Sequence, residues 1–147
     1  MKQTEKGLDG IRFEEKLFPA ADASLPELSD WIEAALEEAG CGLRASMQIL
    51  VAAEEIFTNI AHYAYPGKTG EAAVGLAVTG GKCILRFSDS GIPFDPLRHK
   101  DPDLTPDAQE RAIGGLGIFM VKKTMDDVTY AFCEGKNILT LVKTMSV

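Results

Sequence analysis

Residues 54–67 read EEIFTNIAHYAYPG and are the most informative stretch for predicting the fold. They form the end of an expected long helix and place polar side chains beside its apolar stripe. Glu55, Asn59 and His62 stand at positions i, i+4 and i+7, so they share one helix face. A carboxylate and an amide oxygen on that face could bind a hard cation or orient a hydroxyl group. An ordinary solvated helix face remains the alternative for these residues.

The sequence on both sides of this stretch alternates between strand and helix patterns. Pro66 and Gly67 end the long helix, and Ser24 is expected to cap a shorter helix before it. Expected strands cover residues 11–18, 72–78, 83–89, 128–133 and 137–145, and expected helices cover residues 25–39, 44–65 and 114–125. The residues of the long helix expected in the core are Met47, Leu50, Val51, Phe57 and Ile60. This order predicts an α/β fold, a two-layer sandwich with helices on one face of a mixed, mostly antiparallel sheet.

Composition and charge limit the functions available to the chain. Its 147 residues suit one domain, residues 1–147, and its net charge of −7 disfavours direct binding to nucleic acid or an anionic membrane. The sequence has no apolar run near the ~20 residues needed to cross a bilayer, and its polar start does not resemble a signal peptide. Cys41, Cys83 and Cys133 are widely spaced, which predicts isolated reduced thiols. We therefore expect a cytoplasmic protein.

A second candidate site follows an expected strand, in the run FSDSGIPFDP at residues 87–96. Asp89, at the end of that strand, can accept a hydrogen bond from an exocyclic amine, and Gly91 lets a ring approach the backbone closely. A plain Asx turn remains the alternative. The irregular residues 90–113 that follow are unusually many for a connection in a compact domain, which predicts a functional lid over the ligand.

A third candidate site opens the next expected helix, where glycines stand at positions 114, 115 and 117 around Leu116. Glycines expose backbone N–H groups at the positive end of the helix dipole, which suits an anionic phosphate. A flexible hinge is the alternative. The run is not a Walker A loop, because no Lys-Ser or Lys-Thr pair follows it.

The order of these motifs resembles the Bergerat-type nucleotide-binding fold, the GHKL superfamily of gyrase and histidine kinases. The resemblance covers about residues 24–144. The runs EEIFTNIAHYAYPG, FSDSGIPFDP and GGLGIFMVKKTMDDV are similar to one branch, the anti-sigma-factor serine/threonine protein kinases. Positions that match the branch imply that Asn59 ligates Mg²⁺, that Glu55 is the catalytic base, and that Asp89 reads the adenine amino group above Gly91.

The resemblance also assigns the phosphate end of the site. Gly115 and Gly117, with Leu116 between them, match the second glycine box, and Arg111 is a candidate contact to the phosphates. Two positions depart from the family pattern. Pro93 stands where a second glycine often occurs, and Asn137 opens a pair that is Gly-Thr in many relatives. Asn137 could replace that pair's support of the adenine site by hydrogen bonding.

The function implied by the resemblance is ATP- and Mg²⁺-dependent phosphorylation of a serine on an anti-sigma-factor antagonist. A sigma factor would be the competing partner, bound by a homodimer of the protein. Two alternatives stay open: a regulatory nucleotide-binding module that transfers no phosphate, and an interaction domain of the same architecture that binds no nucleotide.

Overall fold

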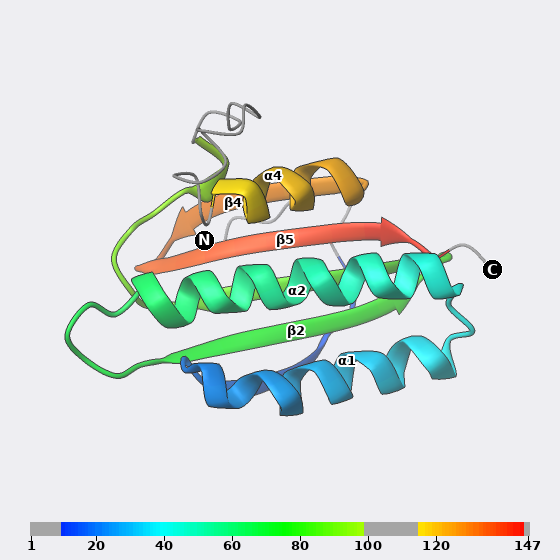
Figure 1. Ribbon diagram of the computed structural model, residues 1–147, viewed down its shortest axis with the longest axis horizontal. Coiled ribbons are helices and arrows are strands. Elements are labelled where there is room, and N and C mark those ends of the chain that lie inside the picture. The colour runs from blue at the N-terminus through cyan, green and yellow to red at the C-terminus, as the bar shows by residue number, and fades with distance from the viewer. Residues whose placement is uncertain (1–9, 99–114, 146–147) are drawn as a thin grey trace.

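The computed structural model describes residues 10–98 and 115–145. Within these ranges the chain forms five strands, three α-helices and two short 3₁₀ turns, coloured in chain order in Figure 1. In order they are β1 (Glu14–Pro19), η1 (Asp22–Ser24), α1 (Leu25–Glu38), α2 (Leu43–Tyr63), β2 (Glu71–Thr79), β3 (Lys82–Asp89), η2 (Pro96–Arg98), α4 (Gly115–Thr124), β4 (Asp127–Cys133) and β5 (Lys136–Thr144). The element order expected from the sequence is confirmed, although β1 begins at Glu14 rather than at residue 11.

The five strands form one sheet in the order β1-β2-β3-β5-β4, and all four pairings between described strands are antiparallel. Two-residue turns join β2 to β3 and β4 to β5, and each turn places both of its residues at positive φ. Such turns match the natural twist of a hairpin. The helices cover one face of this sheet, as Figure 1 shows, so the expected two-layer α/β sandwich is confirmed.

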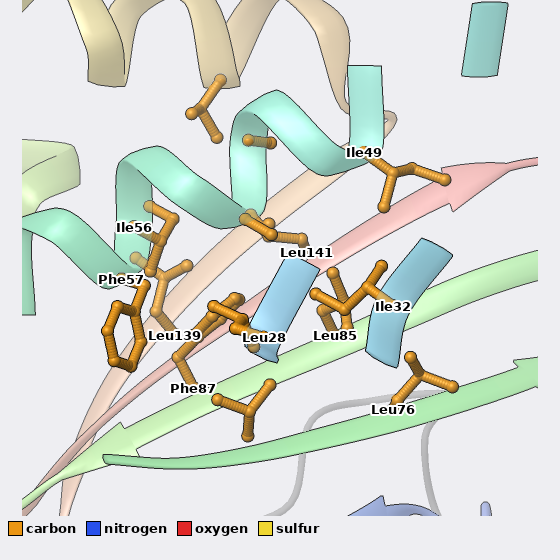
Figure 2. Close-up of a cluster of buried hydrophobic side chains, with 14 of the residues drawn as sticks. Leu28, Ile32, Ile49, Ile56, Phe57, Leu76, Leu85, Phe87, Leu139 and Leu141 are labelled. Atoms are coloured by element: carbon orange, nitrogen blue, oxygen red, sulfur yellow. The ribbon is translucent and has the colours of Figure 1, made fainter. Parts of the chain in front are cut away.

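The core lies between the helices and the sheet, and Figure 2 shows its central side chains. Phe57 of α2 is completely buried and packs edge to face against Phe18 of β1, with 6.2 Å between the ring centroids. Leu28 and Ile32 of α1 and Phe87 of β3 are equally inaccessible. These contacts fix α2 against the strands and thereby set the position of every functional side chain on that helix.

The buried stripe of α2 differs in part from the one expected. Phe57 and Ile60 are buried as predicted, and Leu50 packs against the core. Met47 and Val51, however, are 58% and 62% exposed. They lie about 200° around the helix from Ile49, the residue that enters the core instead. Small side chains complete the true stripe and let the helix approach the sheet closely; they are Ala45, Ala52 and Ala53.

Ser24 precedes α1 as expected, but its side chain does not cap the helix. The Ser24 hydroxyl donates a hydrogen bond of 2.8 Å to the carbonyl of Pro19, five residues earlier. The short turn η1 already holds Ser24 in helical conformation, with φ −81° and ψ −13°, whereas a capping side chain normally needs extended backbone. The predicted cap was therefore wrong, and Ser24 closes the turn between β1 and α1.

Candidate functional site

An apolar pocket lies beside the C-terminal half of α2, at the end of β3. It has an empty volume of about 480 Å³, part of which is open to solvent. Apolar side chains dominate the lining, among them Ile56, Phe87, Phe94 and Leu139. Polar side chains on the lining include Asn59, Asp89, Tyr130 and Asn137. An apolar lining with a few polar side chains is typical of a binding site for a small organic ligand.

Asp89 is the acidic group of this pocket and is only 6% exposed. Its Oδ1 accepts two hydrogen bonds, one of 2.9 Å from the backbone N–H of Gly91 and one of 3.0 Å from the Asn137 amide. No partner for Oδ2 is found among the described residues, where every buried side-chain polar atom has one. Oδ2 is therefore the accessible oxygen, free to accept a hydrogen bond from a ligand.

Asn137 stands directly opposite Asp89 in the register of β3 and β5. Its amide donates to Asp89 and to the carbonyl of Ile92, the latter at 2.9 Å. Its oxygen accepts from the backbone N–H of Phe94 at 3.0 Å and from the hydroxyl of Tyr130. The hydrogen bonding expected of Asn137 is thus present, and it ties the end of β3 to the segment that follows.

Gly91 is required here by backbone packing. A Cβ added at Gly91 would collide with the carbonyl of Ala64, just beyond the end of α2. The same carbonyl accepts a 2.9 Å hydrogen bond from the N–H of Ile92. Tyr65 adds a further connection, because its hydroxyl accepts from the N–H of Ser90 at 2.9 Å. The segment after β3 is therefore fastened to the end of α2, next to the pocket.

Residues 90–98, the start of the expected lid, belong to this fastened part. Asp95 accepts a 2.9 Å hydrogen bond from the N–H of Leu97 and so begins the short turn η2, in which Pro96 is buried. The rest of the expected lid, residues 99–113, lies outside the described residues, and so does Arg111. The expected lid therefore stays a prediction; in its described part, Ile92, Phe94 and Pro96 line the pocket.

Glu55 lies one turn of α2 before Asn59 and outside the lining of the pocket. Its carboxylate lies against Gly117, in the first turn of α4, so closely that a Cβ at Gly117 would collide with it. Burial raises the pKa of Glu55 above its ordinary value. A carboxylate with a raised pKa is a stronger base than an exposed one, which suits a group that accepts a proton.

Asn59 lines the pocket, and Glu55 lies one turn of α2 before it. No group of three or more His, Cys, Asp or Glu side chains in the described part of the chain could hold a metal. Mg²⁺ is commonly held by one or two protein side chains together with substrate phosphates and water. The donor set around Asn59 and Glu55 fits that mode of binding and not a closed protein site.

The structure separates His62 from the other polar residues of α2. The imidazole of His62 lies 2.9 Å from a carboxylate oxygen of Asp22 in η1 and does not line the pocket. Gly115 and Leu116 begin α4, beside Gly117. The expected site residues therefore form two groups joined by α2: Asn59 with Asp89 and Gly91 at the pocket, and Glu55 with the start of α4.

Tyr130 is the functional residue that the sequence did not reveal. Its hydroxyl joins the group around Asn137 from the neighbouring strand β4. Loss of hydration raises the pKa of Tyr130, and the carboxylates of Asp95 and Asp89 add to the rise, which outweighs the lowering by a hydrogen bond with the Phe94 backbone. The phenol therefore stays protonated as a donor. The only sequence signal for it is its position in the closing hairpin seven residues before Asn137, which does not by itself distinguish it from an ordinary strand tyrosine.

Comparisons with known proteins identify the family of the chain. Residues 18–143 match the model of the histidine kinase-like ATPase domain. The chain belongs to this family. It is 33% identical over 106 residues to the serine-protein kinase RsbW of Listeria monocytogenes, covering 69% of this chain and 68% of that protein. RsbW of Bacillus cereus is 29% identical over 93 residues, covering 60% of this chain and 58% of that protein. The resemblance drawn from the sequence is thereby confirmed.

A solved structure supports the fold. The RsbU and RsbW domains of Rv1364c from Mycobacterium tuberculosis match with a TM-score of 0.61 at 16% identity, over 91% of this chain. The matched region is 33% of that longer chain. At this identity the match shows the shared fold. No helix in the described part of the protein is long and apolar enough to cross a membrane.

Proposed function

We propose that the protein is an anti-sigma regulatory factor, an ATP-dependent serine/threonine kinase that phosphorylates an anti-sigma-factor antagonist. The observation that carries this proposal is the placement of Glu55 against the first turn of α4, one helical turn from Asn59 and the pocket. A base, a metal-ligating amide and a helix start that accepts anions are the groups that phosphoryl transfer to a hydroxyl requires. The similarity to the serine-protein kinases RsbW supports it.

The pocket is the proposed site of the adenine ring. Its apolar walls suit a flat aromatic ring, and the free Oδ2 of Asp89 suits the exocyclic amine. Gly91 lets the segment after β3 pack closely against the end of α2, beside the pocket. The phosphates would then extend along α2 toward Asn59 and the N–H groups of Gly115, Leu116 and Gly117.

Asn59 and the phosphates are the proposed ligands of Mg²⁺, which neutralises phosphate charge when it is bound. Glu55 then accepts the proton of the attacking serine hydroxyl. Because burial raises the pKa of Glu55, its affinity for that proton exceeds that of an exposed carboxylate. Arg111 is proposed as a further phosphate contact, as the family resemblance implies.

The proposed partners are those that the sequence resemblance to the anti-sigma-factor kinases implies, and the name serine-protein kinase of the relatives supports a serine acceptor. The acceptor serine belongs to a small antagonist protein, and a sigma factor competes for the same protein. We also propose a cytoplasmic homodimer. The net charge of −7 supports a protein partner over direct contact with nucleic acid.

The test is incubation of the purified protein with γ-labelled ATP, Mg²⁺ and the antagonist encoded nearest to its gene. Transfer of label to one serine of the antagonist, located by mass spectrometry, is the expected result. ATP binding without transfer would instead indicate a regulatory module that acts through partner binding. Absence of any affinity for adenine nucleotides would reject nucleotide chemistry altogether.

A further inference from the structure

The amide of Asn137 uses its complete hydrogen-bonding capacity inside the protein. Its nitrogen donates to Asp89 Oδ1 at 3.0 Å and to the carbonyl of Ile92 at 2.9 Å. Its oxygen accepts from the N–H of Phe94 at 3.0 Å and from Tyr130. With 7% of its surface exposed, Asn137 is held in one orientation, because turning the amide over would oppose donors to donors and acceptors to acceptors.

This fixed orientation also determines which oxygen of Asp89 a ligand can meet. Oδ1 lies between two donors, the Asn137 amide and the N–H of Gly91 at 2.9 Å. Oδ2 has no hydrogen-bond donor from the described part of the protein and faces accessible space. The Asp89 carboxylate therefore presents one oxygen to the pocket, and the direction of that oxygen is set by Asn137 as well as by Asp89.

Tyr130 maintains this arrangement from β4. Its hydroxyl donates to the Asn137 oxygen and thus holds the amide nitrogen toward Asp89. Loss of hydration and the nearby carboxylates of Asp95 and Asp89 raise the pKa of Tyr130, which keeps that proton in place. The direction of the hydrogen bonds therefore runs from Tyr130 to Asn137 and from Asn137 to Asp89.

We propose that Asn137, supported by Tyr130, is a positioning residue that makes the pocket select a 6-amino purine over a 6-oxo purine. This inference rests on the proposed function, since it assumes that a purine nucleotide occupies the pocket. A 6-amino group donates to the free Oδ2, whereas a 6-oxo group would set one acceptor against another. Asn137 acts by preventing the Asp89 carboxylate from turning to another rotamer.

The experiment compares ADP with inosine diphosphate, which carries an oxygen in place of the 6-amino group. Affinities of both are measured by calorimetry, with Mg²⁺, for the full chain and its variants. We expect the unchanged protein to prefer ADP by about tenfold or more, as loss of a hydrogen bond to a charged group implies. Asn137→Ala should reduce that preference to about threefold or less.

The Asp89→Asn variant gives the most direct test, because the expected preference between the two nucleotides changes sign. Asn137 and the N–H of Gly91 are both donors, so they hold the oxygen of the new amide at the Oδ1 position. Its NH₂ group must then face the ligand, and the preference should reverse toward inosine diphosphate. In the double variant Asp89→Asn with Asn137→Ala the amide can turn over, and the preference should largely disappear.

Lys136→Ala is the matched control, because Lys136 precedes Asn137 in β5 but its ammonium lies 3.4 Å from the Ser90 hydroxyl, away from Asp89. Its preference for ADP should equal that of the unchanged protein. Circular dichroism checks that each variant is folded. If Asn137→Ala does not fold, Tyr130→Phe decides, since it removes one hydrogen bond and should lower the preference by about threefold.

A loss of affinity that is equal for ADP and inosine diphosphate in the deciding variant would overturn the inference, because Asn137 would then only shape the pocket. An unchanged preference would overturn it as well. A failure of the unchanged protein to bind either nucleotide is a different result, which rejects the proposed function and this inference with it. The two failures are therefore distinguished by the first titration.

Discussion

The carboxylate of Glu55 occupies the space into which a side chain at Gly117 would project, where α2 meets α4. This contact connects the candidate base directly to the first turn of the helix whose N–H groups are proposed to face the phosphates. Position 117 therefore controls where the carboxylate lies.

Gly117→Ala should leave the protein folded but misplace the base. The carboxylate is the far end of a flexible side chain, so it can turn aside from the added methyl group at little cost in stability. We expect phosphoryl transfer to fall by about 10²-fold, because small misplacements of a reacting group cost that much. Single-turnover transfer of labelled phosphate to the antagonist measures the loss. The contact would be irrelevant to catalysis if the variant transferred phosphate at the original rate.

Glu55→Ala should lower phosphoryl transfer by about 10²–10⁴-fold, the usual contribution of a general base. ATP affinity should stay within a few-fold, because Glu55 lies outside the lining of the pocket. Glu54→Ala is the control. The Glu54 carboxylate accepts a 2.8 Å hydrogen bond from Ser29 of α1, so it faces away from α4 and its loss should spare transfer. Equal rates for the two variants would remove Glu55 from the role of base.

The pH dependence of stability offers an independent test of Glu55. Burial raises its pKa above the ordinary value of 4.5, so the folded state holds this proton at pH values where the unfolded state has released it. Stability therefore falls as pH rises through the interval between the ordinary and the raised pKa, and it stays lowered above that interval. The Glu55→Gln variant should not show this decrease in stability over the same pH interval.

The measurement is urea unfolding of the unchanged protein and of Glu55→Gln across the acidic to neutral range. The difference in free energy of unfolding should shift in favour of the variant as pH rises. A parallel pH dependence in the unchanged protein and Glu55→Gln would mean that the Glu55 carboxylate is hydrated in solution.

Asn59→Ala should impair both nucleotide binding and transfer, but only in the presence of Mg²⁺. The amide is proposed to ligate the metal together with phosphate oxygens, so its loss removes the gain in affinity that Mg²⁺ provides. Calorimetry of ADP with and without Mg²⁺ separates this effect from damage to the pocket wall. An equal loss in the absence of Mg²⁺ would indicate that Asn59 only shapes the pocket.

The sequence predicted the element order because each element has strong local signals. Helical spacing of apolar residues defines α2, and two-residue turns with positive φ, Gly80-Gly81 and Glu134-Gly135, close the hairpins. The exposed side of α2 was harder to predict. Met47 and Val51 are as apolar as the residues that enter the core, and the choice of Ile49 depends on the alanines that face the sheet.

The position of a candidate site residue was predictable where a local pattern places it, as for Asp89 at the end of β3. Contacts between distant segments were not predictable in the same way. The pairing of Asp89 with Asn137 depends on the register of β3 and β5, and the link from Tyr130 depends on the neighbouring strand. Neither register follows from local spacing, although the departure from the family pattern marks Asn137 as unusual.

The run of α2 from Glu55 to Ala64 has a consequence for the length of a ligand. The carbonyl of Ala64 binds the segment after β3 beside the apolar pocket, and Glu55 lies nine residues earlier in the chain. A helix rises about 1.5 Å per residue, so the two ends are ~13 Å apart along its axis. The helix thus fixes the distance that a ligand anchored beside Ala64 must span before it reaches the Glu55 carboxylate.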